Sequence, residues 1–406
     1  MSATSRTSWP TGKQERREHA LVQVEEIRQR LEDSVAESQQ LGYLAPDAVR
    51  ALREAGVLGI MTPDDLGGNV VDPVTAYEII EQIGMIDPST AWTAAILLEG
   101  AGQLATQLSP DQATDLFSSS LALKAGSLRP GTAERTEGGY VITGQWDFVS
   151  GIHHADFVSA AFLVNGADNA VERRTALVPV AQVQILDQWN VLGMKATGST
   201  AFRVEGVFVP DTMVFNPMTS APRTDTPLAR LGMVPYVLQM HPGMVLGAAR
   251  RALNEIIRMA PNKRRGSRIN IGTPKSLAES SWFQREIGEL DAQLSAARAF
   301  ALDVNRRVHE ALEAGRDAVS QGGQLELELL DLMQTSASFA GKTANQVITR
   351  AFRHAGAEAI ADTSVLSRLL RDINTILAHG VLGEAGFEMH GEYLLGMQTL
   401  DNRRMV

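Results

Sequence analysis

GGYVITGQWDFVSG, residues 138–151, is the stretch of sequence that decides the fold. Its β-branched and aromatic residues lie between glycines, which is typical of a strand bounded by turns. Four further stretches of this kind follow, separated by Gly, Asn, Asp and Pro: FVSAAFLV (157–164), RTALVPV (174–180), VQILDQW (183–189) and AFRVEGVFVP (201–210). Short strands at this spacing predict an antiparallel barrel or sandwich over residues 123–227.

The residues before this β domain, 1–122, have the periodicity of packed helices. Apolar side chains recur every three or four positions, as on one face of a helix, at Leu21, Val24, Ile27, Leu31 and Val35. A further helix is expected over 87–102, with Ser89 or Thr90 as its N-cap. The sequence therefore predicts an N-terminal helical domain.

The residues after the β domain, 228–406, return to the helical period. Four long helices are expected, over 237–260, 278–314, 324–355 and 363–398. Long helices joined by short breaks predict a four-helix bundle. Because the chain has no repeat and no low-complexity linker, we expect the three parts of this multidomain α+β chain to pack as one body.

Composition excludes several classes of chemistry. The 406 residues include 37 Lys and Arg against 47 Asp and Glu, a net charge of −10, and no Cys. The absence of Cys excludes disulfides, iron–sulfur clusters and Cys-type zinc sites. The sequence also lacks the GxGxxG, GxxxxGK[ST], GxSxG and HExxH motifs, which argues against the usual nicotinamide and nucleoside-triphosphate folds.

The same survey predicts where the protein works and what it does not bind. The polar N-terminus and the lack of a long apolar run indicate a cytoplasmic protein that does not enter a membrane. A net negative charge argues against nucleic acid as the main partner. No metal site is expected, since the adjacent His153 and His154 diverge and the pair His354 and Glu358 offers too few ligands.

Three segments resemble the flavin-dependent monooxygenases built on the acyl-CoA dehydrogenase fold. They are KAGSLRPGTAERTEGGYVITGQWDFVSGIHHADF (124–157), DQWNVLGMKATGSTAFRVEGVFVPD (187–211) and LRDINTILAHGVLGEAGFEMHGEYLLG (370–396). These enzymes are the oxygenase components of two-component systems, such as the hydroxylases of aromatic polyketides and of p-hydroxyphenylacetate. The helical, β, helical order derived above matches that fold over essentially the whole chain.

The resemblance implies a cofactor and partners. Reduced FMN or FAD, with FMN as the first choice, would come from a separate NAD(P)H:flavin reductase. Oxygen would form a C4a-hydroperoxyflavin, which would hydroxylate a small, aromatic substrate. The resemblance also implies a homo-oligomer, a tetramer or a dimer.

The strand end WDFVSG carries the first expected site residues. By itself it reads equally as an ordinary hydrophobic strand end. The resemblance implies that Ser150 is catalytic, lies beside N5 and C4a of the flavin and hydrogen-bonds it, while Trp146 and Phe148 form the wall. In the turn KATGST (195–200), hydroxyl groups could hold a polar ligand or satisfy one another.

Thr197 and Ser199 are the hydroxyl residues of that turn expected to bind the cofactor. Relatives commonly have Arg-Gly before the TGS, where this chain has Lys195 and Ala196. A bidentate contact that arginine would make is therefore not expected here.

His379 is the main catalytic candidate. In acyl-CoA dehydrogenases whose base comes from this region, a glutamate follows a similar Arg-Asp pair by eight positions, which falls here on Gly380. The resemblance implies that His379, one position earlier, handles the proton, because an imidazole can be neutral at working pH. The alternative is a histidine packed inside the bundle.

Two further sites follow from the resemblance. In that fold, an arginine between the first two bundle helices reaches the flavin phosphate of a neighbouring subunit. The candidates here are Arg264 and Arg268. The alternative is that the basic residues over 263–268 are a solvated helix end. Trp92 either packs in the core or contacts the substrate.

Other functions remain open at this point. The same fold supports a flavin-dependent dehydrogenase or desaturase, although Gly380 argues against one, and an N- or S-oxygenase. A protein that kept the fold without redox chemistry would bind no flavin at all.

Overall fold

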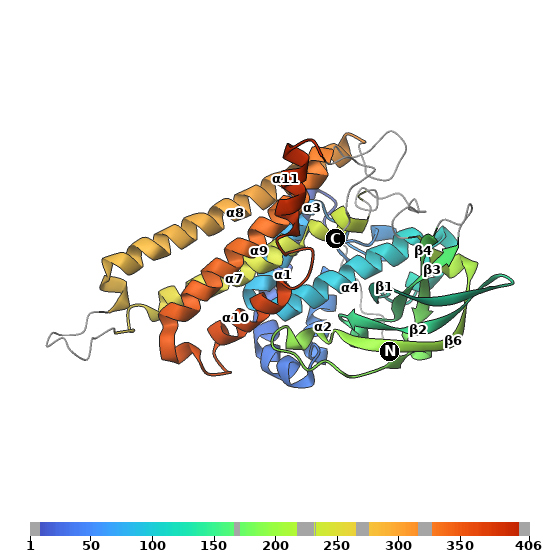
Figure 1. Cartoon of the computed structure of the whole chain (residues 1–406), viewed down its shortest axis with the longest axis horizontal. Helices are drawn as coiled ribbons and strands as arrows, with labels where there is room; N and C mark the ends of the chain where they lie inside the picture. The colour runs from blue at the N-terminus through green and yellow to red at the C-terminus, as the bar shows by residue number, and fades with distance from the viewer. Residues whose placement is uncertain are drawn as a thin grey trace.

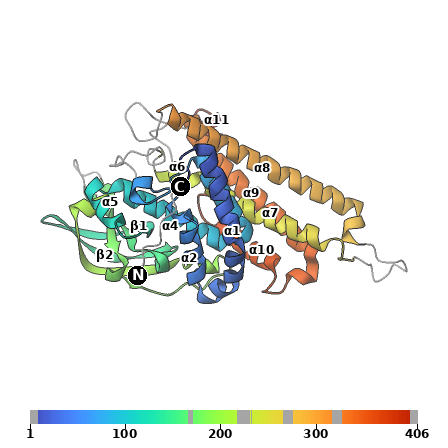
Figure 2. The ribbon, with the colours of Figure 1, turned by 180° about the vertical axis from the view of Figure 1, so that it is seen from behind.

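The computed structural model describes residues 9–165, 171–216, 231, 233–264, 276–315 and 327–397. A sheet lies at one end of the molecule and long helices at the other, with helix α4 (Pro88–Gln107) between them (Figure 1). Helix α1 (Lys13–Leu41) runs across the junction on the opposite side (Figure 2). The order helical, β, helical is thus confirmed.

The N-terminal helices also include α2 (Pro46–Glu54), α3 (Pro73–Ile86) and α5 (Pro110–Phe117). The predicted N-cap of α4 is wrong by two residues. Asp87 caps this helix, because its carboxylate accepts hydrogen bonds from the backbone N–H and the hydroxyl of Thr90. Pro88 then occupies the first helical position, where its missing N–H costs nothing.

Within the described residues, the sheet has seven strands in the order β5-β6-β2-β1-β3-β4-β7. They are β1 (Lys124–Thr136), β2 (Gly139–Val149), β3 (Phe157–Asn165), β4 (Val171–Pro179), β5 (Gln184–Ile185), β6 (Thr200–Pro210) and β7 (Val214–Phe215). All pairs are antiparallel except β1 and β3, so the fully antiparallel prediction is wrong at this pair. A register shift between Ser127 and Gly131 divides β1, whose first half pairs with β3 and second half with β2.

The C-terminal part contains α6 (Met233–Leu238), α7 (His241–Met259), α8 (Ser281–Glu313), α9 (Leu327–Ala355), α10 (Val365–Ile376) and α11 (Ala385–Leu394). The single helix predicted over 363–398 is therefore two helices joined by turns. In the segment between them, the carbonyl of Leu382 lies against α9 at Gly341, where a Cβ atom would collide with it. Ser338 of α9 donates a 2.6 Å hydrogen bond to the carbonyl of Gly383 in the same turn.

The helical parts share one core. Buried apolar side chains form a continuous cluster that joins the N-terminal helices to α7, α8, α9 and α10, while the sheet has a separate core. Helix α3 approaches α7 closely where Gly84, Gly243 and Gly247 leave no room for a side chain. In the described part of the chain, no helix has both the length and the apolar character needed to cross a membrane.

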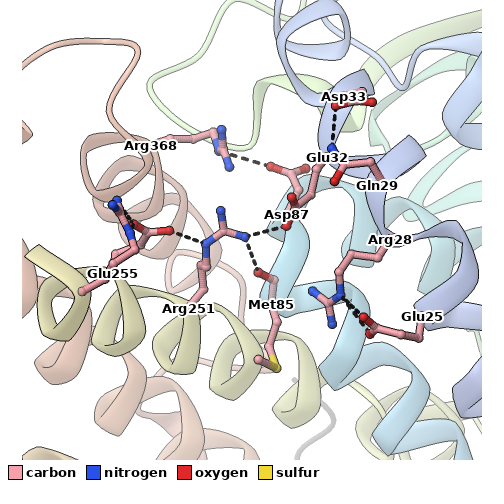
Figure 3. A network of polar contacts seen from close by, with 11 residues as sticks. Glu25, Arg28, Gln29, Glu32, Asp33, Met85, Asp87, Arg251, Glu255 and Arg368 are labelled. Carbon is pink, nitrogen blue, oxygen red and sulfur yellow. Dashed lines mark hydrogen bonds and ion pairs between the residues drawn. The ribbon is translucent and has the colours of Figure 1, made fainter.

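A polar network also joins the two helical parts (Figure 3). Arg251 of α7 donates to Glu32 of α1 at 3.0 Å, to the carbonyl of Met85 of α3 at 3.2 Å and to Glu255 at 2.9 Å. Arg251 is only about one-fifth exposed, so these bonds form largely out of water. One side chain thus holds three helices together.

Replacing Arg251 by methionine, which keeps the apolar stem, is expected to lower the free energy of unfolding by about 1–3 kcal/mol, because charged acceptors lose their donor. Arg28, whose ion pair with Glu25 lies on the surface of one helix, provides the control. Arg28→Met should change stability by less than about 0.5 kcal/mol. Urea unfolding measures both, and equal losses would contradict the importance of the interhelical network.

Candidate active site

A chain of side-chain hydrogen bonds lies where β2 ends. The indole N–H of Trp92 on α4 donates to Oγ of Ser150 at 2.9 Å. Oγ of Ser150 lies 2.6 Å from Oγ of Ser199, which lies 2.6 Å from Oγ1 of Thr197. Thr197 donates to the carbonyl of Met194 at 2.9 Å. The structure therefore brings together four of the predicted site residues.

The direction of every bond in this hydroxyl chain is fixed. The hydroxyl of Thr197 donates its single proton to Met194, so it must accept from Ser199. The hydroxyl of Ser199 thus uses its single proton in the bond to Thr197, so Ser150 must donate to it. Ser150 accepts a hydrogen bond from Trp92 and donates its own proton in the hydrogen bond to Ser199, so it offers any ligand only a lone pair.

Two backbone positions beside this chain are strained. Phe148 (φ 61°) and Met194 (φ 56°) are the non-glycine residues at positive φ in the described ranges. Such conformations cost of order 1–3 kcal/mol and are concentrated at functional sites. They flank the hydroxyl chain from two different segments, which indicates that the surrounding structure imposes the geometry.

Met194 is held by the bundle. Its N–H donates to Oδ1 of the buried Asp372 of α10 at 2.6 Å, and Gly193 lies against the carbonyl of Arg371, where a Cβ atom would collide with it. Burial and the nearby Asp87 raise the pKa of Asp372 to about 7. Arg368, whose Nε lies 3.3 Å from Oδ1 of Asp87, partly offsets this effect (Figure 3).

The stability of the protein should therefore depend on Asp372 between pH 4 and 7. Its pKa is higher in the folded chain than the ordinary 3.8, so the folded state binds more protons and the free energy of unfolding falls as pH rises through this range. Asp372→Asn keeps an acceptor for Met194 and removes the titration. We expect the stability of this variant relative to wild type to increase from pH 5 to pH 7.5, as measured by urea unfolding. A difference that is constant with pH would contradict this interpretation.

His379 lies in the turn between α10 and α11, and its side chain is exposed. The rings of His379 and Trp92 meet edge to face, with centroids 5.0 Å apart. The Nδ1 atom accepts from the N–H of Val381 at 3.3 Å, so the proton of the neutral ring is on Nε2. Although solvent reaches the ring, desolvation by the surrounding protein lowers the pKa of His379 and favours the neutral form.

His241, at the start of α7, is a site residue that the sequence analysis missed. Its ring meets Trp92 edge to face at 5.2 Å, and its Nδ1 lies 2.8 Å from the carbonyl of Val237. Burial, with the proximity of His379, lowers the pKa of His241 to about 4. Nothing around it in the sequence distinguishes it from an ordinary helix start, where proline follows in the first turn.

Trp146 lies in the core of the sheet and is not a member of the hydrogen-bonded chain at Ser150. Its ring is fully buried in the core of the sheet, stacked on Phe202, and its N–H donates to the carbonyl of Ala161 at 2.9 Å. Alternate residues of a regular strand face the same side, so Phe148 should follow Trp146 inward. A register shift between Trp146 and Val149, with the positive φ of Phe148, turns the latter outward instead.

The remaining candidates, Phe148, Arg264 and Arg268, are not members of the hydrogen-bonded chain. Phe148 is 60% exposed, and its ring lies under the guanidinium of Arg129 at 5.0 Å. Arg264 is exposed beyond the end of α7, which points away from the sheet (Figure 1). Arg268 lies outside the described residues.

Comparisons with known proteins agree with this architecture. Sequence models of the acyl-CoA dehydrogenase N-terminal and C-terminal domains match residues 16–115 and 239–384. Among solved structures, XiaF from Streptomyces sp., in complex with FADH2 and glycerol, superposes with a TM-score of 0.86. That similarity covers 96% of this chain and 98% of XiaF at 24% sequence identity, which supports the fold.

Curated relatives cover almost the whole chain. Indole-3-acetate monooxygenase from Pseudomonas putida is 27% identical over 91% of this chain and 93% of its own length. The flavin-dependent monooxygenase oxygenase subunit HsaA from Rhodococcus jostii is 26% identical over 91% of this chain and 97% of its own length. The chain therefore belongs to the acyl-CoA dehydrogenase family, within its group of flavin-dependent monooxygenases.

Proposed function

We propose that this protein is the oxygenase component of a two-component flavin monooxygenase. It takes reduced flavin from a separate NAD(P)H:flavin reductase and acts on a small aromatic molecule. When bound, the reduced flavin supplies the electrons that activate O2, so that one oxygen atom is transferred and the other leaves as water. The names of the relatives, an indole-3-acetate monooxygenase and an oxygenase subunit, support both parts of the proposal.

The fixed direction of the hydroxyl chain is the observation that carries this function. Ser150 presents a lone pair to its ligand, so it pairs best with an N–H group. A reduced flavin has an N–H at N5, whereas an oxidised flavin has an acceptor there. Ser150 therefore favours the reduced form, as expected for a protein that receives its flavin already reduced.

The other residues around the chain also fit a flavin. The exposed ring of Phe148 offers a flat apolar surface, and the buried hydroxyl of Thr93 has no hydrogen-bond partner among the described residues. His379 holds a proton on Nε2 beside Trp92 and can donate a hydrogen bond from it to a reacting oxygen. Gly380 leaves no carboxylate base for a dehydrogenase at this position.

The phosphate end of the flavin requires a second copy of the chain in this proposal. Helix α7 runs away from the sheet, and Arg264 follows its C-terminal end (Figure 1). We propose that Arg264 or Arg268 of one subunit binds the flavin phosphate in its neighbour, within a dimer or tetramer. Both FMN and FAD carry the phosphate that this arginine would bind, and FMN stays our first choice.

Anaerobic titration tests the proposal directly. Reduced FMN and FAD should bind at least tenfold more tightly than their oxidised forms, and Ser150→Ala should lose most of this preference, because a charge-free hydrogen bond contributes about 1 kcal/mol. On mixing with O2, the wild-type complex should pass through an absorbance distinct from both reduced and oxidised flavin. Equal affinity for the two redox states and direct return to oxidised flavin would refute the oxygenase function. If the protein binds oxidised flavin tightly and an acyl thioester reduces that bound flavin, the result would instead support a dehydrogenase.

A further inference from the structure

One face of the central helix α4 retains access to solvent. The side chains of α4 are buried except at Ile96, Gln103 and Gln107, which are partly accessible. Trp92 and Glu99, at 8% and 4% exposed, continue this series at spacings of three and four residues. These residues therefore lie on one helical face, which we call the α4 stripe.

Glu99 is the charged residue of the α4 stripe. It is buried, and its Oε1 has no hydrogen-bond partner within the described ranges. Nδ1 of His241 lies 3.7 Å from Oε1, but its proton is used by the carbonyl of Val237 at 2.8 Å. A buried carboxylate oxygen without a donor is costly, so a donor from outside the chain would stabilise it.

Contacts connect Glu99 to the catalytic end of the site. His241 lies beside Glu99 and also packs edge to face on Trp92, which contacts both Ser150 and His379. Seven residues of helix separate Trp92 from Glu99, which corresponds to roughly 10 Å along the axis. A two-ring aromatic molecule with one hydrogen bond at its far end spans a distance of this order.

Burial raises the pKa of Glu99, and the charge of Lys124 opposes this effect. Lys124 is itself buried and donates a hydrogen bond to Oγ of Ser159 at 3.0 Å. Lys124 therefore leaves Oε1 of Glu99 without a donor among the described residues.

We propose that Glu99 selects aromatic substrates with an N–H or O–H group and accepts a hydrogen bond from it. This contact fixes the far end of the substrate, so that the opposite end faces Ser150 and His379. The proposal rests on the proposed function, since it names the substrate class of the same site. Glu99 thus acts as a specificity-determining residue.

Indole and benzofuran provide a matched pair of probes, because they have nearly the same shape and differ in the N–H group. Calorimetry on the flavin-free protein should show indole binding about 10–100-fold more tightly than benzofuran. Glu99→Leu should remove this discrimination by weakening indole binding. Glu99→Gln, which keeps an acceptor oxygen and nearly the same size, should retain a preference of about three- to tenfold.

Turnover with reduced flavin gives a second readout. With indole, Glu99→Leu should raise KM by about the factor lost in binding, while peroxide release rises because the substrate is poorly placed. Equal affinity of wild type for the two probes, or no binding of either, would overturn the proposal, as would unchanged discrimination in Glu99→Gln and Glu99→Leu. If the wild type discriminates between the probes but binds reduced and oxidised flavin equally and returns directly to oxidised flavin with O2, the oxygenase function is refuted and the contact of Glu99 with the N–H group stays in place.

Discussion

Replacing His379 by alanine is expected to reduce product formation about 10²–10³-fold, the usual contribution of a positioned hydrogen-bond donor to a reacting oxygen. The imidazole lies beside Trp92, is reached by solvent and holds its proton on Nε2. Without it, the reacting oxygen loses this positioned hydrogen-bond donor. The measurement is the ratio of oxygenated product to hydrogen peroxide at saturating reduced flavin and O2.

The pH profile separates this role from a structural one. Desolvation lowers the pKa of His379 below 6.5, so the ring is neutral at and above pH 7. Product yield should be constant from pH 7 to 8 and fall in the acidic range, where the imidazolium forms. His379→Asn, which keeps a side-chain N–H, should remove this acidic fall and retain reduced-flavin affinity. An acidic fall that persists in this variant would show that another group is responsible.

Trp146 and Phe148 should have opposite effects when replaced by alanine. Trp146 fills the core of the sheet, so Trp146→Ala is expected to lower the free energy of unfolding by about 3–5 kcal/mol. Phe148 is 60% exposed, so Phe148→Ala should change stability by less than 1 kcal/mol and weaken binding of reduced flavin instead.

Urea unfolding and flavin titration on the same two variants distinguish the roles. The reverse pattern, with Trp146→Ala stable but poor in flavin binding, would return Trp146 to the wall of the site. If Trp146→Ala does not fold, Trp146→Phe supplies a smaller loss of the same sign. In that variant the side chain is smaller and no longer donates a hydrogen bond to the carbonyl of Ala161.

The sequence predicts most of the fold because each part has its own period. Alternation over 138–151 and the three-to-four spacing of the flanking segments each follow from which side chains are buried. The parallel pairing of β1 with β3 depends on contacts between distant segments, which no local pattern contains. The segment before α11 likewise packs through a contact between Leu382 and Gly341, residues more than forty positions apart.

The candidate site also combines residues that the sequence predicted with residues that only the tertiary structure reveals. The resemblance placed Ser150, Ser199, Thr197 and Trp92 in the expected region, and the structure joins them by hydrogen bonds. The resemblance implied that Trp146 and Phe148 both form the wall, but a bulge that the strand pattern does not reveal turns Phe148 outward while Trp146 stays in the core of the sheet. The roles of His241 and Asp372 depend on tertiary contacts with Trp92 and Met194, so their sequence neighbourhoods carry no signal for them.

The hydroxyl chain next to Trp92 also affects how protons can move through the site. It begins at an indole N–H that does not ionise and ends at a peptide carbonyl, so it is closed at both ends. A proton could move along the chain only if all the hydroxyls rotated together. Neither of these two end groups is an acid or a base at working pH. The hydroxyl chain therefore carries no proton to or from Ser150, and the solvent-facing imidazole of His379 is left as the ring beside Trp92 that can exchange protons with water.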